Sequence, residues 1–420
     1  MYERLMPEMK TGQELMEALG RYPAYDAGIR EGTVTERLTA LSDIYDVYIP
    51  SQMSSEIYHK LYLGLMRSLQ KKGTLQAVRQ QYENGKGIRN ERGNGIIGGS
   101  DSFTIIGASG IGKSSAVFRA VGLIMEKEVI EVKEPYCRIA PCVVVQCPFD
   151  SSVKGLLLEI LRKVDEVLDS KYYSNALRAR ATTDMLIGSV SQVTLNHIGL
   201  LIVDEIQNVA NSRNGKALVG MLTQLINNSG ISICMVGTPE SIPFFEQAMQ
   251  LARRSLGLQY QAMGFDEGFC RICRLLFRYQ YTRQGMELTD AVMGWLYEHC
   301  GGNISVLVSL LHDAQEIAIL EGRDVLDMEA FEDAYKKRMS MLHDYLEPGI
   351  KRKKQCSGRG RKDTSRILES RDGQDMISES GRNHVAERKH LPQLVMEAKE
   401  NNRDIVEVLR ENFSVEEVAV

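Results

Sequence analysis

The residues best suited to chemistry in this sequence form one short run, G-x-x-x-x-G-K-S, made of Gly107, Ala108, Ser109, Gly110, Ile111, Gly112, Lys113 and Ser114. Glycines at these places let the backbone turn its N–H groups inward onto phosphate oxygens. Lys113 supplies a positive charge for the β- and γ-phosphates, and the hydroxyl of Ser114 can hold Mg²⁺. ATP and Mg²⁺ are therefore the predicted cofactors.

The context of this run supports the prediction. The apolar segment from Ser102 to Ile106 is predicted to be a strand that enters the loop. A helix is predicted from Ser115 to Met125, and its N-terminal dipole would point at the bound phosphates. Ser115, at the start of this helix, completes the predicted nucleotide-binding set.

Two carboxylates follow a second apolar run, and they predict that the bound nucleotide is hydrolysed. Gly199 to Asp204 has the pattern of a buried parallel strand, and Glu205 comes directly after it. Asp204 can hold the Mg²⁺ shell, and Glu205 can orient or deprotonate an attacking water. The alternative is a buried strand before an acidic helix start, which the upstream phosphate loop makes the weaker interpretation.

Three further residues complete the predicted catalytic set. Thr238 follows the predicted strand 231–236, where it can sense a γ-phosphate, and Pro239 after it also suits a helix N-cap. Arg253 and Arg254 end the next predicted helix. One of them is expected to reach the γ-phosphate of a neighbouring subunit as an arginine finger. The alternative is that both are surface arginines near a helix C-terminus.

The composition narrows the class of protein. The 420 residues carry a formal charge of −4, which does not indicate a nucleic-acid partner. The eight cysteines are scattered and fit reduced thiols, and the lone pair Cys270 and Cys273 is expected to pack rather than bind zinc. No apolar run has the length of a membrane span, and the N-terminus lacks an apolar signal core. A cytoplasmic protein without a membrane partner is expected.

The pattern of elements predicts an α/β P-loop NTPase with a mostly parallel sheet covered by helices on both faces. Further strands are predicted over 140–146 and helices over 153–168 and 215–228, so strands and helices alternate. The predicted domains are a mostly helical N-terminal region over 1–95, the α/β core over 96–264, a helical lid over 265–345 and a tail over 346–420.

The tail is basic around Lys351 to Arg366 and is expected to be largely disordered when free, with a short helix over 391–409. Its basic run could contact phosphates or a partner protein, or could be a solvated linker.

A family resemblance becomes specific at four stretches besides the phosphate loop. They are the segment from Gln146 to Leu156 with Val164-Asp165, the run from Gly199 to Gln207, the segment Val236–Pro239, and Ala252-Arg253-Arg254. With these, the chain resembles AAA+ ATPases of the TnsC/TniB type, regulators of target-site choice in DNA transposition. The resemblance covers roughly residues 40 to 345 and looks like the longer TnsC type.

The resemblance implies an ATP-dependent homo-oligomer, a ring or a filament, that assembles on double-stranded DNA. It also implies that transposase subunits are recruited to a target chosen by a separate target-selection protein. In one respect the sequence departs from the general AAA+ pattern. The lid helix expected after Gly301-Gly302-Asn303 has no arginine where a second sensor would lie, which suggests a slow ATPase.

The predicted DNA contact is a loop that follows the second core strand. Ser151 and Ser152 offer hydroxyl and backbone donors, and Lys154 offers charge, all suited to phosphate oxygens rather than to bases. The alternative is a capped helix with a solvated lysine.

Two other functions are also compatible with this sequence. An origin-type initiator or helicase loader would share the sheet and both carboxylates, although the tail is too short and basic for the winged-helix domain that such proteins usually carry. A non-hydrolysing, nucleotide-gated signalling scaffold would not need Glu205.

Overall fold

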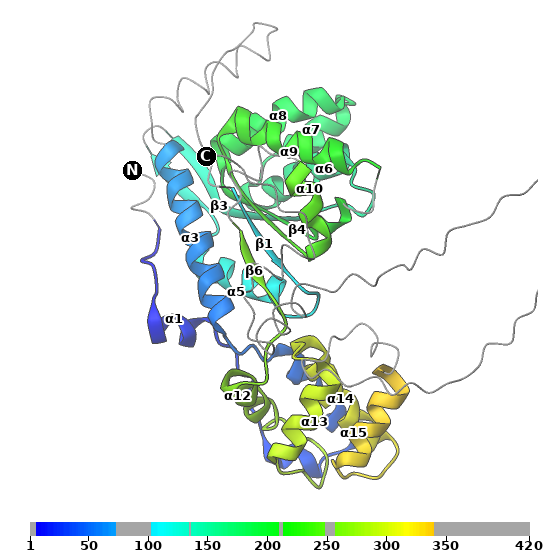
Figure 1. Ribbon diagram of the computed structural model, residues 1–420. Helices are drawn as coiled ribbons and strands as arrows, with labels where there is room; N and C mark the ends of the chain where they lie inside the picture. Colours follow the sequence, from blue (N-terminus) through cyan, green and yellow to red (C-terminus); the bar gives the residue numbers. More distant parts are fainter. Residues whose placement is uncertain (1–5, 73–101, 134–135, 210–212, 248–256, 340–420) are drawn as a thin grey trace, which may run out of the picture. The chain divides into compact units, whose positions relative to one another are not determined.

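The computed structural model describes residues 6–72, 102–133, 136–209, 213–247 and 257–339 (Figure 1). All of them belong to one compact unit, residues 1–353. Arg253, Arg254 and the whole predicted tail lie outside the described residues.

A six-stranded sheet forms the centre of the fold, in the order β2-β3-β4-β5-β1-β6. Its strands are β1 (Phe103–Gly107), β2 (Ile130–Lys133), β3 (Tyr136–Gln146), β4 (Ile198–Asp204), β5 (Ser232–Gly237) and β6 (Leu258–Tyr260). Every neighbouring pair is parallel except β2 and β3, which are antiparallel. The strand of the phosphate loop thus lies beside β5, and β5 separates it from the strand that ends in Asp204.

Alternation along the central strands gives the sheet two apolar faces. Ile105, Ile202 and Val236 contribute to one core cluster, whereas Ile106, Val203 and Met235 contribute to the other. Successive residues of a strand point to opposite faces, so each strand serves both clusters. The predicted parallel α/β P-loop fold is confirmed.

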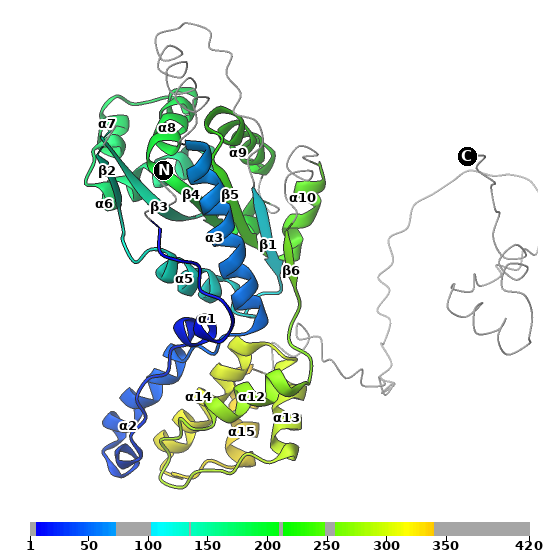
Figure 2. The same cartoon turned by 90° about the vertical axis from the view of Figure 1, so that its left-hand side faces the viewer.

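Helices cover both faces (Figures 1 and 2). One face carries α1 (Gly12–Leu19), α3 (Gln52–Lys72) and α5 (Lys113–Ile124), whose apolar residues belong to the first cluster. The other carries α6 (Val153–Leu168), α8 (Thr183–His197) and α9 (Gly215–Ser229), and α7 (Tyr172–Arg178) packs against α6. The short helix α10 (Ile242–Gln247) follows β5.

A third core cluster belongs to the lid. It contains α12 (Glu267–Leu276), α13 (Asp290–Cys300), α14 (Ile304–Leu320), α15 (Met328–Ala334) and the π-helical turn η6 (Tyr335–Met339). The N-terminal elements η2 (Ala27–Glu31), α2 (Val34–Leu41) and η3 (Ser42–Asp46) pack here rather than on the sheet, and Leu41 and Ile44 are part of this core. The described N-terminal residues therefore pack partly on one face of the sheet and partly in the lid core.

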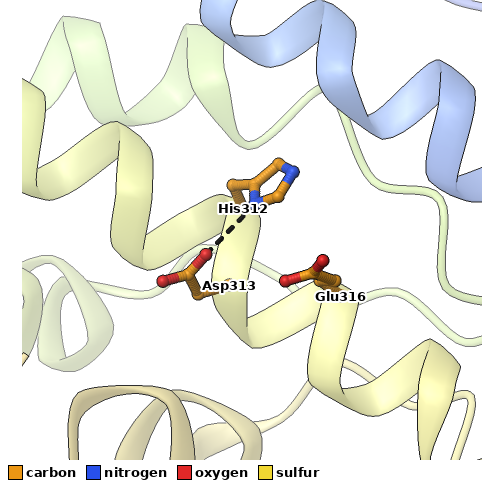
Figure 3. Close-up of side chains that lie close together, drawn as sticks. All are labelled: His312, Asp313 and Glu316. Carbon is orange, nitrogen blue, oxygen red and sulfur yellow. Dashed lines mark hydrogen bonds and ion pairs between the residues drawn. The ribbon is translucent and has the colours of Figure 1, made fainter. Parts of the chain in front are cut away.

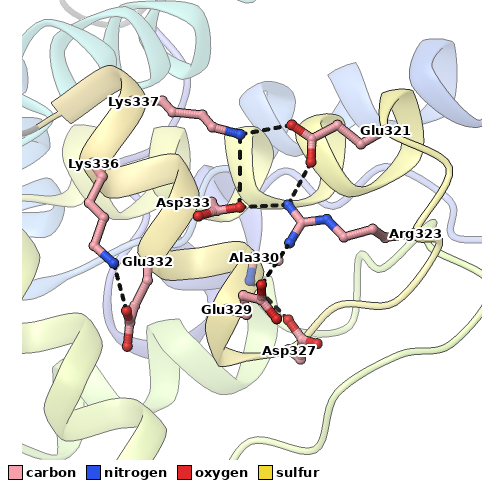
Figure 4. A network of polar contacts seen from close by, with 9 residues as sticks. All are labelled: Glu321, Arg323, Asp327, Glu329, Ala330, Glu332, Asp333, Lys336 and Lys337. Atoms are coloured by element: carbon pink, nitrogen blue, oxygen red, sulfur yellow. Dashed lines mark hydrogen bonds and ion pairs between the residues drawn. The ribbon is translucent and has the colours of Figure 1, made fainter.

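A network of charged side chains joins the end of α14 to α15 and η6 (Figure 4). Arg323 pairs with Glu321 and with Asp333, both at 2.9 Å, and Lys337 pairs with Glu321 at 2.7 Å. These groups are partly exposed, so the network fixes geometry more than it adds stability. Among the described residues, no single helix has the length and apolar character to span a membrane. The bent pair of α13 and α14 meets these criteria only as a pair.

The long elements predicted within the described residues are present with small shifts at their ends, because each carries a clear apolar period. Sequence reasoning missed the short strands β2 and β6, and it missed α7 and α8 entirely. Glu131 and Lys133 interrupt the apolar pattern of β2, and β6 has only three residues, Leu258 to Tyr260. Such short strands are defined by their neighbours in the sheet rather than by local sequence.

Candidate nucleotide site

The phosphate loop joins β1 to α5 and has the backbone that its glycines allow. Gly110 has φ +79° and Gly112 has φ +94°, a region that residues with a Cβ rarely adopt. The buried Lys113 points back into the loop, where its Nζ donates to the carbonyl oxygens of Gly107 at 2.8 Å and Ala108 at 2.7 Å. The loop is therefore already wrapped around the ammonium group.

The negative charge near Lys113 comes from carboxylates at the end of β4 and just after β5. Burial lowers the pKa of Lys113, while the carboxylates of Asp204, Glu205 and Glu240 act to raise it. Removing an ammonium from water disfavours its charged form, and nearby negative charge opposes that effect. Bound phosphate oxygens would add negative charge at the same place and favour the protonated lysine.

The two predicted carboxylates occupy different environments at the end of β4. Asp204 is buried, and its Oδ1 accepts a hydrogen bond from the backbone N–H of Glu205 at 2.8 Å. Glu205 is exposed and has φ +56°, which is uncommon for a residue with a side chain. The left-handed turn directs the chain away from the sheet immediately after the strand.

Thr238 follows β5 at the N-cap of the turn η5 (Pro239–Ser241). Its hydroxyl donates to the carboxylate of Glu240 rather than capping the turn. Its backbone N–H donates to Oε1 of Gln207 at 3.2 Å. The threonine is thus tied to the turn after the carboxylate strand.

A cleft of about 230 Å³ brings most predicted site residues together. Its wall includes part of the phosphate loop, both carboxylates and the residues after β5: Ser109, Gly110, Gly112, Lys113, Ser114, Ser115, Asp204, Glu205, Gln207, Gly237, Thr238 and Ser305. Ser114 and Asp204 present a hydroxyl and a carboxylate to the same space, and both are oxygen ligands of the kind Mg²⁺ takes. The residues present therefore fit a magnesium–phosphate group.

A larger cavity of about 530 Å³ adjoins the cleft and was not predicted from the sequence. The two share Gly110, Gly112, Ser115 and Ser305. The cavity wall comes from the segment Tyr45–Ser54, from Tyr260 and Met263, and from Ile304 and Val308 of the lid. Its size and mostly apolar wall suit a base and a ribose. Four segments far apart in the chain build it, so no single sequence motif predicts it.

The lid touches the phosphate loop directly. Asn303, the N-cap of α14, donates from Nδ2 to the carbonyl oxygen of Ser109 at 2.8 Å. The backbone N–H of Ser305 donates to the carbonyl oxygen of Gly110 at 3.0 Å. The start of the lid helix thus lies against the loop at the position where the sequence lacks an arginine.

The predicted DNA-contact loop is partly corrected. Ser151 is fully buried, and its hydroxyl donates to the carbonyl oxygen of Asn208 at 3.0 Å, so it is not available to a phosphate. Ser152 caps α6 by accepting from the N–H of Gly155 at 3.1 Å. Lys154 is exposed, as the prediction requires, and Phe149 in the same loop is 86% exposed.

Outside this cleft, the described residues hold one group of metal-ligand type, His312, Asp313 and Glu316 on α14 (Figure 3). Arg338 forms ion pairs with both carboxylates. These acids therefore already have a cation, and the cluster is explained as a contact between α14 and η6.

Residues 99–259 match the family model described as "Bacterial TniB protein". This range resembles TniB. The predicted resemblance is thus confirmed over the range that holds the phosphate loop, both carboxylates and Thr238. No curated protein matches the sequence.

Solved structures share parts of the fold of this TniB-like chain. The Aeropyrum pernix ORC1 protein in complex with DNA is 13% identical, with a TM-score of 0.40 and coverage of 62% of this chain and 64% of that one. Drosophila ORC bound to DNA is 14% identical, with a TM-score of 0.41 and coverage of 80% and 70%. The Aeropyrum pernix ORC2 protein (ADPNP-ADP complexes) is 17% identical, with a TM-score of 0.39 and coverage of 57% and 62%. The chain spans less than two thirds of the two archaeal proteins.

Proposed function

We propose that this protein is an ATP-dependent, DNA-binding AAA+ regulator of DNA transposition. The observation that carries the proposal is the cleft that gathers Lys113, Asp204, Glu205 and Thr238 inside the TniB-like range. A nucleotide-binding protein without hydrolysis would not require a carboxylate placed directly after the metal-binding one.

Each residue of the cleft has a proposed task. Lys113 leaves its two loop carbonyls and neutralises the β- and γ-phosphates. Backbone N–H groups of the loop and the N-terminus of α5 bind the remaining phosphate oxygens. The adjoining cavity between Tyr45–Ser54 and the lid takes the base and ribose. Together these contacts hold the terminal phosphate at the carboxylate edge of the sheet.

The chemical step is proposed to be attack of water on the γ-phosphate, which breaks the bond from the γ-phosphorus to the β–γ bridging oxygen and releases ADP and phosphate. Mg²⁺, held by Ser114 and Asp204, would neutralise charge on the phosphates. Glu205 orients the water and takes its proton, and the exposed position of this carboxylate leaves room for water. Thr238 contacts the γ-phosphate. Arg253 or Arg254, outside the described residues, remains the predicted finger that a neighbouring subunit supplies.

We also propose that identical subunits assemble on DNA as a ring or filament, in which Lys154 and the exposed loop before α6 face duplex phosphates. The assembly recruits or activates transposase at a site set by a target-selection protein. These roles are what the TniB resemblance implies, and a cytoplasmic location is part of the same proposal. Contacts to phosphates rather than to bases make the binding weakly dependent on sequence.

The decisive experiment combines turnover with assembly. ATP hydrolysis is measured with and without duplex DNA, and the same samples are examined by electron microscopy for rings or filaments. The wild-type protein should hydrolyse ATP faster with DNA and assemble on it. Lys113→Ala is the matched control and should do neither, because it cannot bind the phosphates. If DNA does not change the rate of ATP hydrolysis and no rings or filaments form on it, the DNA-dependent part of the proposal is refuted.

A further inference from the structure

Among the described residues of the site, Gln207 is the side chain that hydrogen-bonds both to the carboxylate of Glu205 and to the backbone of Thr238. Its Nε2 donates to the carboxylate of Glu205, and its Oε1 accepts from the backbone N–H of Thr238 at 3.2 Å. The partners fix the orientation of the amide, because a carboxylate can only accept and an N–H can only donate. A glutamine satisfies both with one group.

The surroundings hold this amide in place. Gln207 lies in the turn η4 (Ile206–Val209), which begins directly after Glu205, and the buried Ile206 anchors the turn. Gly237 leaves the space that the amide needs, since a Cβ there would lie 2.8 Å from Oε1 of Gln207 and 2.7 Å from Ile206. A larger residue at 237 would therefore displace the amide from between the two strands.

We propose that Gln207 is a positioning residue that transmits the position of the Thr238 turn to Glu205. Contact between Thr238 and a γ-phosphate moves or fixes the backbone of that turn, and the amide carries the change to the carboxylate. The left-handed backbone of Glu205 leaves its side chain exposed, so the amide is its only described hydrogen-bonded side-chain partner. This proposal deepens, and rests on, the proposed ATP hydrolysis.

The first test needs no nucleotide. Hydrogen–deuterium exchange of the Thr238 amide is compared in wild type, Gln207→Met, Glu205→Ala and the double variant. Gln207→Met keeps the volume but removes the acceptor, so exchange should be about fivefold to tenfold faster, the effect of losing one hydrogen bond. Glu205→Ala should also speed exchange at Thr238, which it does not touch, and the double variant should resemble Gln207→Met alone.

The second test asks whether Gln207 positions Glu205 for the reaction or contributes to ATP binding. Gln207→Met should lower kcat about tenfold to a hundredfold, the usual cost of a slightly misplaced group, while ATP affinity stays within about twofold. Gln259→Met, on the exposed side of β6, is the matched control and should leave kcat, ATP affinity and Thr238 exchange unchanged. Unchanged kcat in Gln207→Met, or unchanged Thr238 exchange in either single variant, would overturn the proposal.

The two tests also distinguish this inference from the proposed function. If the wild-type protein bound ATP but did not hydrolyse it, or if Glu205→Gln hydrolysed it normally, the proposed function would fail. The exchange experiment would still decide whether Gln207 links Glu205 to Thr238.

Discussion

Nδ2 of Asn303 lies 2.8 Å from the carbonyl oxygen of Ser109, which joins the start of the lid helix to the middle of the phosphate loop. The same side chain accepts from the N–H groups of Ser305 and Val306 and so also caps α14. The lid thus contacts the loop through a neutral amide and not through an arginine. An amide can hold the lid near the nucleotide without adding positive charge to the reaction.

Replacing Asn303 by serine separates these two roles. Serine still caps the helix, so the free energy of unfolding should change by only a few tenths of a kcal/mol. Its shorter side chain cannot reach Ser109, so nucleotide should dissociate about threefold to tenfold faster, the effect of about one lost hydrogen bond. Stopped-flow release of a fluorescent ADP analogue measures this rate. An unchanged dissociation rate would mean that this contact does not hold the lid.

Glu205→Gln should retain ATP and lose turnover, because the amide cannot take a proton while Asp204 still contributes its carboxylate. We expect kcat to fall at least about a hundredfold, with ATP affinity within about threefold. Calorimetry and a phosphate-release assay measure the two quantities. Glu267→Gln on the lid surface is the control. Turnover within about tenfold of wild type would exclude Glu205 as the base.

Lys154→Ala should weaken binding to duplex DNA and reduce its salt dependence, by roughly one unit of slope for each subunit engaged. Fluorescence anisotropy with ATP at several salt concentrations measures both. Lys163→Ala, on the same helix but paired with Glu166, is the matched control and should have little effect. If Lys154→Ala assembles normally and binds with the same affinity and slope, the DNA contact lies elsewhere, and the basic run 351–366 is the next candidate.

Lys72 gives a prediction about pH. Its Nζ donates to the carbonyl oxygens of Thr194, at 2.8 Å, and Leu195 near the end of α8, and burial lowers the pKa of this lysine from 10.5 to about 7. Between these values the unfolded chain binds a proton that the folded protein does not, so stability rises with pH. Below about pH 7 and above 10.5 this contribution is constant.

The measurement compares urea unfolding of wild type and Lys72→Met from pH 6.5 to 9.5. The stability of wild type relative to the variant should increase with pH, by at most about 1.4 kcal/mol per unit. Cys137 and His197 interact with Lys72 but are present in both proteins, so their own titration largely cancels. A difference that is flat across this range would show that Lys72 stays charged in the folded protein.

The sequence was sufficient where a function depends on neighbouring residues. Lys113, Asp204 and Thr238 could be predicted to lie near one another, as they do in the cleft, because each lies next to a strand whose apolar pattern is clear. Gln207 and Asn303 could not be assigned their contacts, because their partners, Thr238 and Ser109, are adjacent only after the strands and the lid have packed. Ser151 was misjudged for the same reason, since its burial depends on Asn208 in another loop.

The position of β1 in the sheet has a consequence for the order in which the protein is made. Phe103 in β1 pairs with Cys234 in β5, and the other neighbour of β1 is β6. During synthesis the phosphate loop therefore leaves the ribosome long before any strand that can pair with it. A nascent chain that ends before Ser232 carries the loop sequence but no partner for its strand. Since a ligand stabilises only the state that binds it, we expect ATP to favour folding only after β5 has been made.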